Sequence, residues 1–490
     1  MTQTTPPIEL NGTASRLGPL TSLPEGFADQ LRAVCETVTD VVATAEASRD
    51  WWPLAMHWSL AGQVAQRAAA IARPGDAAEV AAVLALCNRC GVPVTPAGGR
   101  SGVLGGSVPL FGGVLLDMTA LQGIVSVDEI SGVVEVLPGT FGPDMENELR
   151  DQHGLTVGHF PQSFDIATVG GWVACRGAGQ YSTRYGKIEQ MVVGLEIALA
   201  DGTLVRTGGF PAGAQGPDLS QLFIGSEGTL GVVTRVWLKT HPVAPAERRA
   251  AFAFASFEAG IEACRRILRR GATPAVLRLY DAAESQRGQG GDGTYCVLLV
   301  LDEGDDRLVD ATMSIVAEEC AACESLPVEL VDKWMHHRND TSALQALTRK
   351  GFVVDTLEIA APWSALAGIV REVPLAMLAI PHARAATCHL SHSYPDGACL
   401  YFTFAATPPA DEIEATYVAL WDAGQLSVIA HGGNLSHHHG VGLNRARFVP
   451  LALGSAFPIL QSLKNALDPN GIMNPGKMGL HTTFGEVRWP

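Results

Sequence analysis

Residues 158–172 read Gly-His-Phe-Pro-Gln-Ser-Phe-Asp-Ile-Ala-Thr-Val-Gly-Gly-Trp, and the fold assignment depends on this stretch. It continues through Arg176-Gly-Ala-Gly179 and Tyr185-Gly186. The paired glycines at 170 and 171 leave a length of backbone without side chains, so that a flat ring can lie directly against it. Taken alone the stretch does not identify a ligand, and its meaning depends on the segments that flank it.

A glycine-rich loop precedes this stretch and a second one follows it. The first reads Thr95-Pro-Ala-Gly-Gly-Arg-Ser-Gly-Val-Leu-Gly-Gly-Ser107, after a short strand expected at residues 92–94. A loop of this kind is most often an ordinary turn. It matches neither the GxGxxG fingerprint nor the GxxxxGK[ST] phosphate loop, which disfavours a nicotinamide enzyme or an ATPase. The second loop reads Leu222-Phe-Ile-Gly-Ser-Glu-Gly-Thr-Leu-Gly-Val-Val-Thr234 and leads into a strand.

These three blocks, in this order and spacing, resemble the FAD domain of the vanillyl-alcohol-oxidase and para-cresol-methylhydroxylase superfamily. The resemblance implies FAD as the cofactor, held in a two-subdomain cradle beside a cap domain. Strands that alternate with helices along the chain favour a layered α+β structure. We therefore predict an α+β fold, with an FAD-binding domain of this type and an α+β cap that contains an antiparallel sheet.

The resemblance also implies a role for each block. The first block is expected to wrap the pyrophosphate, the second to run along the ribityl chain and the isoalloxazine, and the third to line the adenine and ribose end. The first comprises Pro96, Ala97, Gly98, Gly99, Arg100, Ser101 and Gly102. The second comprises Gln162, Ser163, Phe164, Asp165, Ile166, Ala167, Thr168, Gly170, Gly171, Cys175, Arg176, Gly177 and Ala178. The third comprises Glu227, Gly228, Thr229, Leu230, Gly231, Val232 and Val233.

A chain of 490 residues is long enough for two or three folded units. We expect a helical leader over residues 1–66 and the FAD-binding domain over 67–242. Residues 243–454, where strands alternate with amphipathic helices, are expected to form the cap that binds the substrate. Residues 455–490 are expected to return to the FAD domain.

Within the superfamily, the chain most resembles alkyldihydroxyacetonephosphate synthase and its bacterial relatives over residues 70–480. The matching segments are Val-Leu-Arg278-Leu-Tyr, Tyr394-Pro-Asp-Gly-Ala-Cys-Leu-Tyr401-Phe and Gly432-Gly-Asn-Leu-Ser-His-His-His439-Gly-Val-Gly442. By position, Tyr401 matches the active-site tyrosine of that family, and Arg278 matches an arginine that its activity requires. His437, His438 and His439 match its essential histidine cluster.

The family reaction exchanges an acyl group for an alkyl group in ether-lipid synthesis. It begins with removal of a proton next to a carbonyl, and the flavin N5 then traps the substrate as an adduct. A histidine that titrates near pH ~6–7 can take and return that proton. A tyrosine phenol can donate to the leaving acyl oxygen. The resemblance thus implies a flavin that acts as an electron sink rather than as a redox shuttle.

The three adjacent histidines also suit other interpretations, among them a metal site and a polar turn. Consecutive residues cannot all face one ion on a regular element, so we predict no metal here. Related 2-hydroxyacid dehydrogenases carry a Gly-Glu-His-Gly segment whose glutamate binds a metal, and this chain has His438 at that place. His389 and His392 keep FAD-linked oxidation of a hydroxy compound as the alternative, and a catalytically silent FAD-binding protein is a third.

One position departs from the synthase pattern. The family has a substrate-binding arginine on the helix before the strand at residues 353–358, and this chain has Leu344 there. A phosphate dianion ordinarily binds a bidentate arginine. The loss argues for a substrate without the dihydroxyacetone-phosphate headgroup, unless Arg338, Lys333 or Arg349 takes over the role.

Charge, hydropathy and cysteine content limit the kinds of partner and the location that we expect for the chain. A formal net charge of −16 argues against a nucleic-acid partner. No apolar run reaches the about 18 residues of a membrane span, and the N-terminus lacks the blocks of a secretory signal, which favours a cytoplasmic protein. Ten scattered cysteines, two pairs of them at CxxC spacing in helical stretches, are expected to be reduced and free of zinc. We expect a small-molecule or lipid-like substrate, with peripheral contact to a membrane permitted.

Two further expectations come from the resemblance alone. The synthase branch binds FAD without a covalent bond, so we expect non-covalent FAD here and a structural role for His159. The same branch implies a homodimer.

Overall fold

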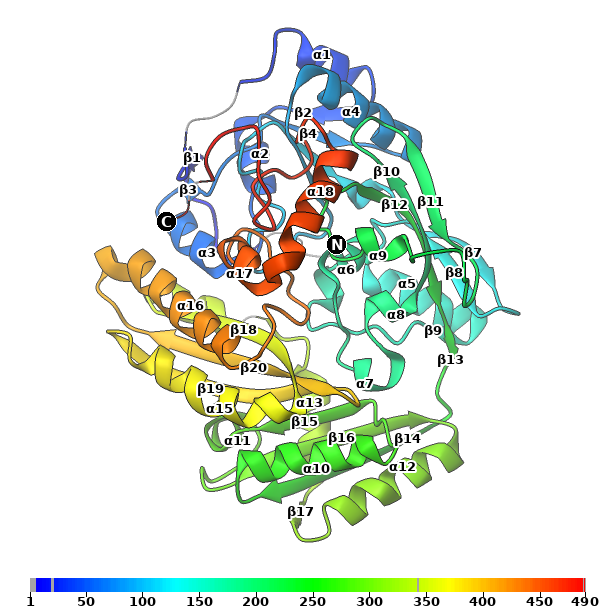
Figure 1. Cartoon of the computed structure of the whole chain (residues 1–490), viewed down its shortest axis with the longest axis vertical. Coiled ribbons are helices and arrows are strands. Elements are labelled where there is room, and N and C mark those ends of the chain that lie inside the picture. The colour runs from blue at the N-terminus through cyan, green and yellow to red at the C-terminus, as the bar shows by residue number, and fades with distance from the viewer. Residues whose placement is uncertain (1–5, 19–21, 342, 488, 490) are drawn as a thin grey trace.

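The computed structural model describes residues 6–18, 22–341, 343–487 and 489, with the backbone but not the side chains of residues 343 and 344. Figure 1 shows the N-terminal half and the C-terminal segment together in the upper part of the molecule, above a layer of strands and helices from residues 246–430. Helices, two antiparallel sheets and one mixed sheet with parallel strand pairs make up most of this structure, so the predicted α+β class is confirmed.

The first sheet has four strands in the order β2-β4-β6-β5. Its strands are β2 (Glu36–Val38), β4 (Ala70–Arg73), β5 (Val94–Ala97) and β6 (Val114–Asp117), and the helices around it are α1 (Phe27–Arg32), α2 (Val41–Ala47) and α4 (Ala77–Cys90). Helix α3 (Pro53–Leu60) packs in a different hydrophobic core. The prediction of a helical leader up to residue 66 is wrong in one respect. Strand β2 pairs with β4, and β1 (Ala14–Ser15) pairs with β3 (Gln63–Val64), so the leader contributes an edge strand to the sheet.

The second sheet has five antiparallel strands in the order β11-β10-β12-β8-β7. They are β7 (Ile124–Asp128), β8 (Val133–Val136), β10 (Val192–Ala198), β11 (Leu204–Gly208) and β12 (Val232–Lys239). The helices of this region are α5 (Gly142–Glu148), α6 (Val169–Cys175), α7 (Ser182–Tyr185), α8 (Ile188–Met191) and α9 (Ser220–Phe223), and β9 (Leu155–Thr156) pairs with β13 (His241–Pro242).

The third sheet has seven antiparallel strands in the order β17-β14-β16-β15-β19-β20-β18. They are β14 (Ala246–Phe254), β15 (Val276–Tyr280), β16 (Cys296–Gly304), β17 (Glu324–Leu326), β18 (Val353–Pro362), β19 (Ala383–Ser393) and β20 (Gly397–Ala406). Its helices are α10 (Phe257–Arg269), α11 (Ala282–Gly288), α12 (Asp306–Glu319), α13 (Glu329–His337), α14 (Ala343–Thr348), α15 (Trp363–Leu378) and α16 (Ile413–Ala430). We call this unit the cap.

The two faces of the cap sheet bury different clusters, because side chains alternate along a strand. In β16, Leu298 and Val300 pack in one core with α10, whereas Val297 and Leu299 pack in another with Trp334 of α13. Both faces are therefore covered by helices. The face toward α13 is the one that also meets Phe160 and Tyr181 from the upper part of the molecule.

Local sequence signals predicted both ends of helix α4 correctly. Asp76 accepts a hydrogen bond from the backbone N–H of Glu79 at the start of α4, and Gly91 ends that helix at φ 63°. The strand expected at 92–94 lies instead at Val94–Ala97, because it pairs in register with β6.

The C-terminal segment runs back to the first sheet. Residue Met473 bridges to Val94 in parallel, and the Val94 N–H donates to the carbonyl of Ile472 at 2.8 Å. Before this, residues 446–467 are the one stretch among the described residues that is long and apolar enough to cross a membrane. This stretch consists of a 3₁₀ turn (Ala446–Phe448), α17 (Val449–Leu453), a second 3₁₀ turn (Gly454–Ala456) and α18 (Phe457–Leu467), so it is not a single straight helix.

Candidate active site

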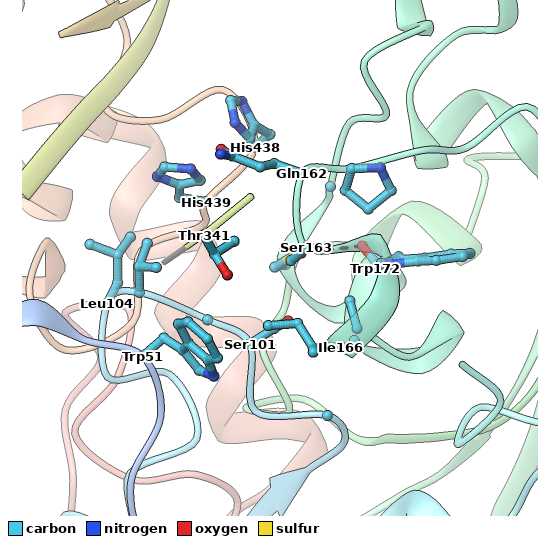
Figure 2. A pocket seen from close by; sticks show the side chains of 18 of the residues that line it. Trp51, Ser101, Leu104, Gln162, Ser163, Ile166, Trp172, Thr341, His438 and His439 are labelled. Atoms are coloured by element: carbon cyan, nitrogen blue, oxygen red, sulfur yellow. Dashed lines mark hydrogen bonds between the residues drawn. The ribbon is translucent and has the colours of Figure 1, made fainter. Parts of the chain in front are cut away.

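A cavity of about 800 Å³ lies where the three sheets meet. The three glycine-rich blocks line one side of it, and strands β15, β18, β19 and β20 of the cap line the other. Figure 2 shows Trp51, Ser101 and Leu104 on one side, Ser163, Ile166 and Trp172 on another, and His438 and His439 above them. The volume of the cavity falls in the usual range for a ligand or cofactor site.

The three blocks contact one another, and glycine is required where they meet. A Cβ atom at Gly99 would stand 2.0 Å from the carbonyl oxygen of Ile166, and one at Gly98 would stand 2.3 Å from Thr168 Oγ1. A Cβ atom at Gly228 would stand 2.8 Å from Pro96 Cγ. The first block is therefore packed against both of the others without room for side chains.

Each block also holds one non-glycine residue in the left-handed backbone region. These residues are Arg100 at φ 56°, Arg176 at φ 57° and Glu227 at φ 50°. A non-glycine residue in this region costs about 1–3 kcal/mol, and such strain gathers at functional sites. The strain therefore marks the same three segments that the sequence singled out.

Most of the predicted site residues line the cavity. The cofactor-binding residues that do so are Pro96, Ala97, Gly98, Gly99, Arg100, Ser101, Gly102, Gln162, Ser163, Ile166, Ala167, Thr168, Gly170, Gly171, Cys175, Gly177, Ala178, Glu227, Gly228, Gly231, Val232 and Val233. The structure places Phe164, Asp165, Arg176, Thr229 and Leu230 outside the lining. Arg278, Tyr401, His438 and His439 line it, whereas His437 lies behind them.

The histidine segment is held by one buried carboxylate, that of Glu358 on β18. Its two oxygens accept hydrogen bonds from the backbone N–H groups of His437, His438 and His439 at 2.5, 3.1 and 2.9 Å. They also accept from Ser436 Oγ at 2.8 Å and from the fully buried Arg445 at 2.7 Å. Burial alone would raise the pKa of Glu358, but the charge of Arg445 holds that pKa well below its usual range. Glu358 thus fixes the backbone that presents the imidazoles.

The far end of the histidine segment is held by Glu227 of the third block. Its carboxylate accepts from the backbone N–H groups of Val441 and Gly442 at 2.5 and 2.7 Å. Burial raises the pKa of Glu227. This residue therefore joins a predicted cofactor loop to the histidine segment, besides lining the cavity.

The imidazoles are held neutral. Burial lowers the pKa of His437 to about 3 and that of His439 to about 4, and it lowers the pKa of His438 well below its usual range. The prediction of a histidine that titrates near pH 6–7 is therefore wrong, because it took no account of how deeply the segment is buried. Neutral imidazoles can accept a proton at physiological pH.

A chain of hydrogen bonds joins two imidazoles of the cavity wall, and we call it the histidine relay. His392 Nδ1 lies 2.7 Å from Ser182 Oγ, which lies 3.1 Å from the hydroxyl of Tyr394. That hydroxyl lies 2.9 Å from His437 Nε2, and His437 Nδ1 lies 2.9 Å from His438 Nδ1. The relay thus starts and ends at His392 and His438, which both line the cavity.

Tyr401 and Arg278 are fixed by a second network. Arg278 donates to the hydroxyl of Tyr280 at 2.7 Å, and its Nη2 lies 2.6 Å from His389 Nε2. His389 pairs with Glu284 at 2.7 Å and stacks on Tyr401 with ring centroids 4.8 Å apart. The Tyr401 hydroxyl donates to Thr356 Oγ1 at 3.1 Å, and burial raises the pKa of Tyr401. Tyr401 is therefore a protonated phenol and Arg278 a fixed cation.

Four potential ligand atoms for a metal lie within 4.8 Å of one another, on Glu358, Cys399, His437 and His438. The carboxylate of Glu358 already accepts the hydrogen bonds of the histidine segment and of Arg445. A metal could use it only by breaking those bonds. The donor set therefore suits a structural carboxylate rather than a metal ligand.

Comparison with known proteins identifies the family. Residues 68–208 match the family described as FAD binding domain, and residues 244–478 match FAD linked oxidases, C-terminal domain. The chain is 34% identical over 428 residues to the uncharacterized FAD-linked oxidoreductase YgcU of Escherichia coli K12, covering 83% of this chain and 88% of that protein. It is 29% identical over 462 residues to alkyldihydroxyacetonephosphate synthase of Dictyostelium discoideum, covering 85% of this chain and 74% of that protein.

The chain belongs to the FAD-linked oxidoreductase family. Its fold is also that of a solved alkyldihydroxyacetonephosphate synthase, with a TM-score of 0.77 at 24% identity over 96% of this chain and 90% of that one. FAD is the cofactor, and the predicted superfamily is confirmed.

The cavity lining fits such a cofactor. Buried polar atoms there without a hydrogen-bond partner include both ring nitrogens of His159, Trp172 Nε1, Asp50 Oδ2 and Trp51 Nε1. Buried polar groups are normally paired, so these atoms fit a polar ligand in the same space. Together with the glycine contacts, they indicate that the three blocks could hold FAD along the cavity.

Sequence reasoning missed several lining residues. Asp50, Trp51 and Met56 come from the leader, for which the sequence predicted helices and no site residue. Thr356, Thr403 and Ser391 come from cap strands, where isolated polar residues carry no motif. The alternating pattern of those strands was the one signal that could have pointed to them.

The substitution Gly99→Ala tests the cradle. Because the new Cβ would stand 2.0 Å from the Ile166 carbonyl oxygen, the first two blocks have to move apart. We expect the affinity for FAD to fall by about tenfold or more, since an ångström-scale shift disrupts a preorganised site. Fluorescence titration of the apoprotein with FAD measures this. Gly368→Ala is the control, because nothing lies within 4 Å of its Cβ position, and its FAD affinity should not change.

Proposed function

We propose that this protein is an FAD-dependent transferase that exchanges the acyl group of an acyl-glycerone-phosphate-like substrate for an alkyl group. The observation that carries the proposal is the meeting of a protonated phenol, a fixed guanidinium and neutral imidazoles in one cavity, from Tyr401, Arg278 and His438. The similarity to alkyldihydroxyacetonephosphate synthase supports it. When bound, FAD supplies an electron sink for the reacting carbon.

His438 is the base in this proposal. Its Nδ1 faces His437, which leaves Nε2 for a substrate proton next to a carbonyl. As Nε2 takes that proton, the proton on Nδ1 can pass to His437, and the His437 Nε2 proton can pass to Tyr394. The relay then carries a proton through Ser182 to His392 Nδ1, and His392 in turn releases its Nε2 proton to the leaving group in the cavity, so that no imidazole has to remain a buried cation.

Tyr401 and Arg278 act on the oxygens of the substrate. The raised pKa of Tyr401 keeps its phenol protonated, so that it can donate a hydrogen bond to the leaving carboxylate. Arg278 is held by Tyr280 and His389 and can stabilise negative charge that develops on the carbonyl oxygen. Both roles require fixed positions, which the stack of His389 on Tyr401 supplies.

FAD-linked oxidation of a hydroxy compound is the second candidate. The E. coli relative is described as an FAD-linked oxidoreductase, and His389 and His392 both line the cavity. A neutral imidazole can also take the hydroxyl proton of a 2-hydroxy acid.

One experiment separates the two. The holoenzyme is incubated without oxygen with acyl-glycerone phosphate and a labelled fatty alcohol. The proposal predicts a labelled ether product and a flavin that ends oxidised. Bleaching of the flavin by D-lactate or glycolate, without ether formation, would establish the oxidation instead.

The substitution Tyr394→Phe tests the histidine relay. It removes the hydroxyl between Ser182 and His437 while keeping the ring that stacks near His437. We expect FAD to stay bound and the rate of ether formation to fall by roughly 10- to 100-fold, toward the lower part of the range for lost acid–base catalysis. Steady-state rates measure this. The control is Tyr295→Phe, whose exposed hydroxyl donates to the Gly290 carbonyl at 3.4 Å, away from the cavity. Equal rates for Tyr394→Phe and the wild type would show that the relay is not used.

A further inference from the structure

The cap side of the cavity is strongly basic although the whole chain carries a net charge of −16. Arg278 of β15, Arg287 of α11, Lys333 of α13 and Arg338 just after α13 all line it, against the two carboxyl groups of Asp340 and Asp355. We call this surface the basic wall. An excess of one sign of charge in a cleft concentrates ligands of the opposite sign.

Most of these cations are not neutralised by the protein. Glu284 lies 3.6 Å from Arg287 and so forms an ion pair with it. Within the described part of the chain, no carboxylate lies within 4.0 Å of the charged nitrogens of Arg278, Lys333 or Arg338. Lys333 donates instead to the Gly288 carbonyl, and Arg278 to Tyr280. The basic wall therefore keeps positive charge that a bound anion can neutralise.

Aromatic rings fix the side chain of Arg338, and one of its nitrogens has no hydrogen-bond partner, so that it can bind an anion. Its guanidinium lies over the rings of Phe160 and Tyr181, with its central carbon 5.5 and 5.1 Å from their centroids. Its backbone carbonyl accepts from Gln180 Nε2 at 3.1 Å. Nη1 is buried without a hydrogen-bond partner. An unpaired buried guanidinium nitrogen is costly, so this geometry fits a site whose partner comes from the ligand.

The wall continues directly from the reacting groups. Arg278 is bonded to His389, which stacks on Tyr401, and its guanidinium also lies 5.9 Å from the ring of Trp334 on α13. The segment after Arg338 then crosses to the second block, where Gln162 Nε2 donates to the Asp340 carbonyl. Figure 2 shows Thr341 of this segment projecting into the cavity beside Gln162 and Ser163. A substrate that reacts beside Tyr401 can therefore reach Arg338 with its other end.

We propose that the basic wall binds a phosphomonoester headgroup of the substrate, with Arg338 as the residue that pairs with it. The proposal rests on the proposed function for the identity of the substrate backbone. The family resemblance predicts a substrate-binding arginine at position 344, where this chain has Leu344; the side chain of Leu344 is not among the described ones. In the proposal, Arg338 takes the role of that arginine. Of the three substitutes that the sequence offers, Arg338 and Lys333 line the cavity, whereas Arg349 donates to the Pro7 carbonyl at a separate pocket. Three unpaired cations suit a dianion better than a carboxylate.

The test measures binding without turnover. Glycerol 3-phosphate, glycerate and glycerol are titrated into the holoenzyme by isothermal calorimetry, with wild type, Arg338→Gln, Arg338→Lys and Arg349→Gln. We expect glycerol 3-phosphate to bind the wild type most tightly and to bind Arg338→Gln about tenfold or more weakly, as for a lost charge-assisted hydrogen bond. Arg338→Lys should recover part of the affinity, and Arg349→Gln should bind like the wild type.

The alternative outcomes are distinct. Equal affinities of Arg338→Gln and the wild type for glycerol 3-phosphate would overturn the proposal. Tighter binding of glycerate would also overturn it and would identify the headgroup as a carboxylate. Wild-type binding that depends on Arg338, in an enzyme that forms no ether, would uphold the basic wall while the proposed function fails. The flavin spectrum of each variant shows that it is folded and loaded.

Discussion

Replacing His438 with asparagine is expected to lower the rate of ether formation by about 10²- to 10⁴-fold while FAD stays bound. The imidazole is the base of the proposed reaction, and loss of a positioned base typically costs that factor. The asparagine keeps a polar side chain in the space, and the backbone N–H that bonds to Glu358 is unchanged. Steady-state rates and the flavin absorbance of the purified variant measure the two properties separately.

The matched control is His382→Asn. His382 is a partly exposed histidine of the cap that pairs with Glu412 at 3.1 Å, away from the cavity. The rate of ether formation by His382→Asn should stay within about twofold of the wild-type rate, as expected for a surface change that leaves the site intact. If His438→Asn instead yields the apoprotein, the histidine has a structural role at the cofactor and its assignment as the base is wrong.

The substitution Glu358→Gln is expected to lower the free energy of unfolding by about 3–5 kcal/mol, because it leaves the fully buried Arg445 without its charge partner. It also places an amide N–H₂ opposite backbone N–H groups that now share a carboxylate. The histidine segment should therefore lose its position, and ether formation should fall together with stability. Urea unfolding at constant FAD concentration measures the first effect.

Asp422→Asn is the control for Glu358→Gln. Asp422 pairs with Arg447 at 2.8 Å in a partly exposed ion pair. Such pairs contribute about 0–1 kcal/mol, so the variant should unfold close to the wild type. A similar small change for Glu358→Gln would show that the buried pair does not hold the histidine segment.

The cradle was predictable from the sequence because its physical requirement is local. A segment such as Gly98-Gly99 has to be glycine where backbone meets backbone, and that need appears as a motif. The same holds for the cap of α4, where Asp76 and Gly91 mark the ends. Tyr401 and His438 were found through the family resemblance rather than through any property of their own segments.

The rest of the site depends on contacts between distant segments, which no local pattern encodes. Glu358 precedes the histidines by some 80 residues and looks like one polar residue in an apolar strand. The low pKa values of the histidines follow from their burial, which appears only after the cap and the C-terminal segment meet. Arg338 could be named as one of three candidates, but only its position in the cavity wall separates it from Arg349.

The central claim is that His438 removes a proton from the carbon next to the substrate carbonyl and passes it into the relay. The most direct measurement is solvent exchange. The holoenzyme converts acyl-glycerone phosphate and a fatty alcohol in D₂O, and mass spectrometry locates deuterium in the ether product. The account predicts deuterium at that carbon in the product of the wild type, and no comparable exchange with His438→Asn. Ether product that carries only protium at that carbon would contradict it.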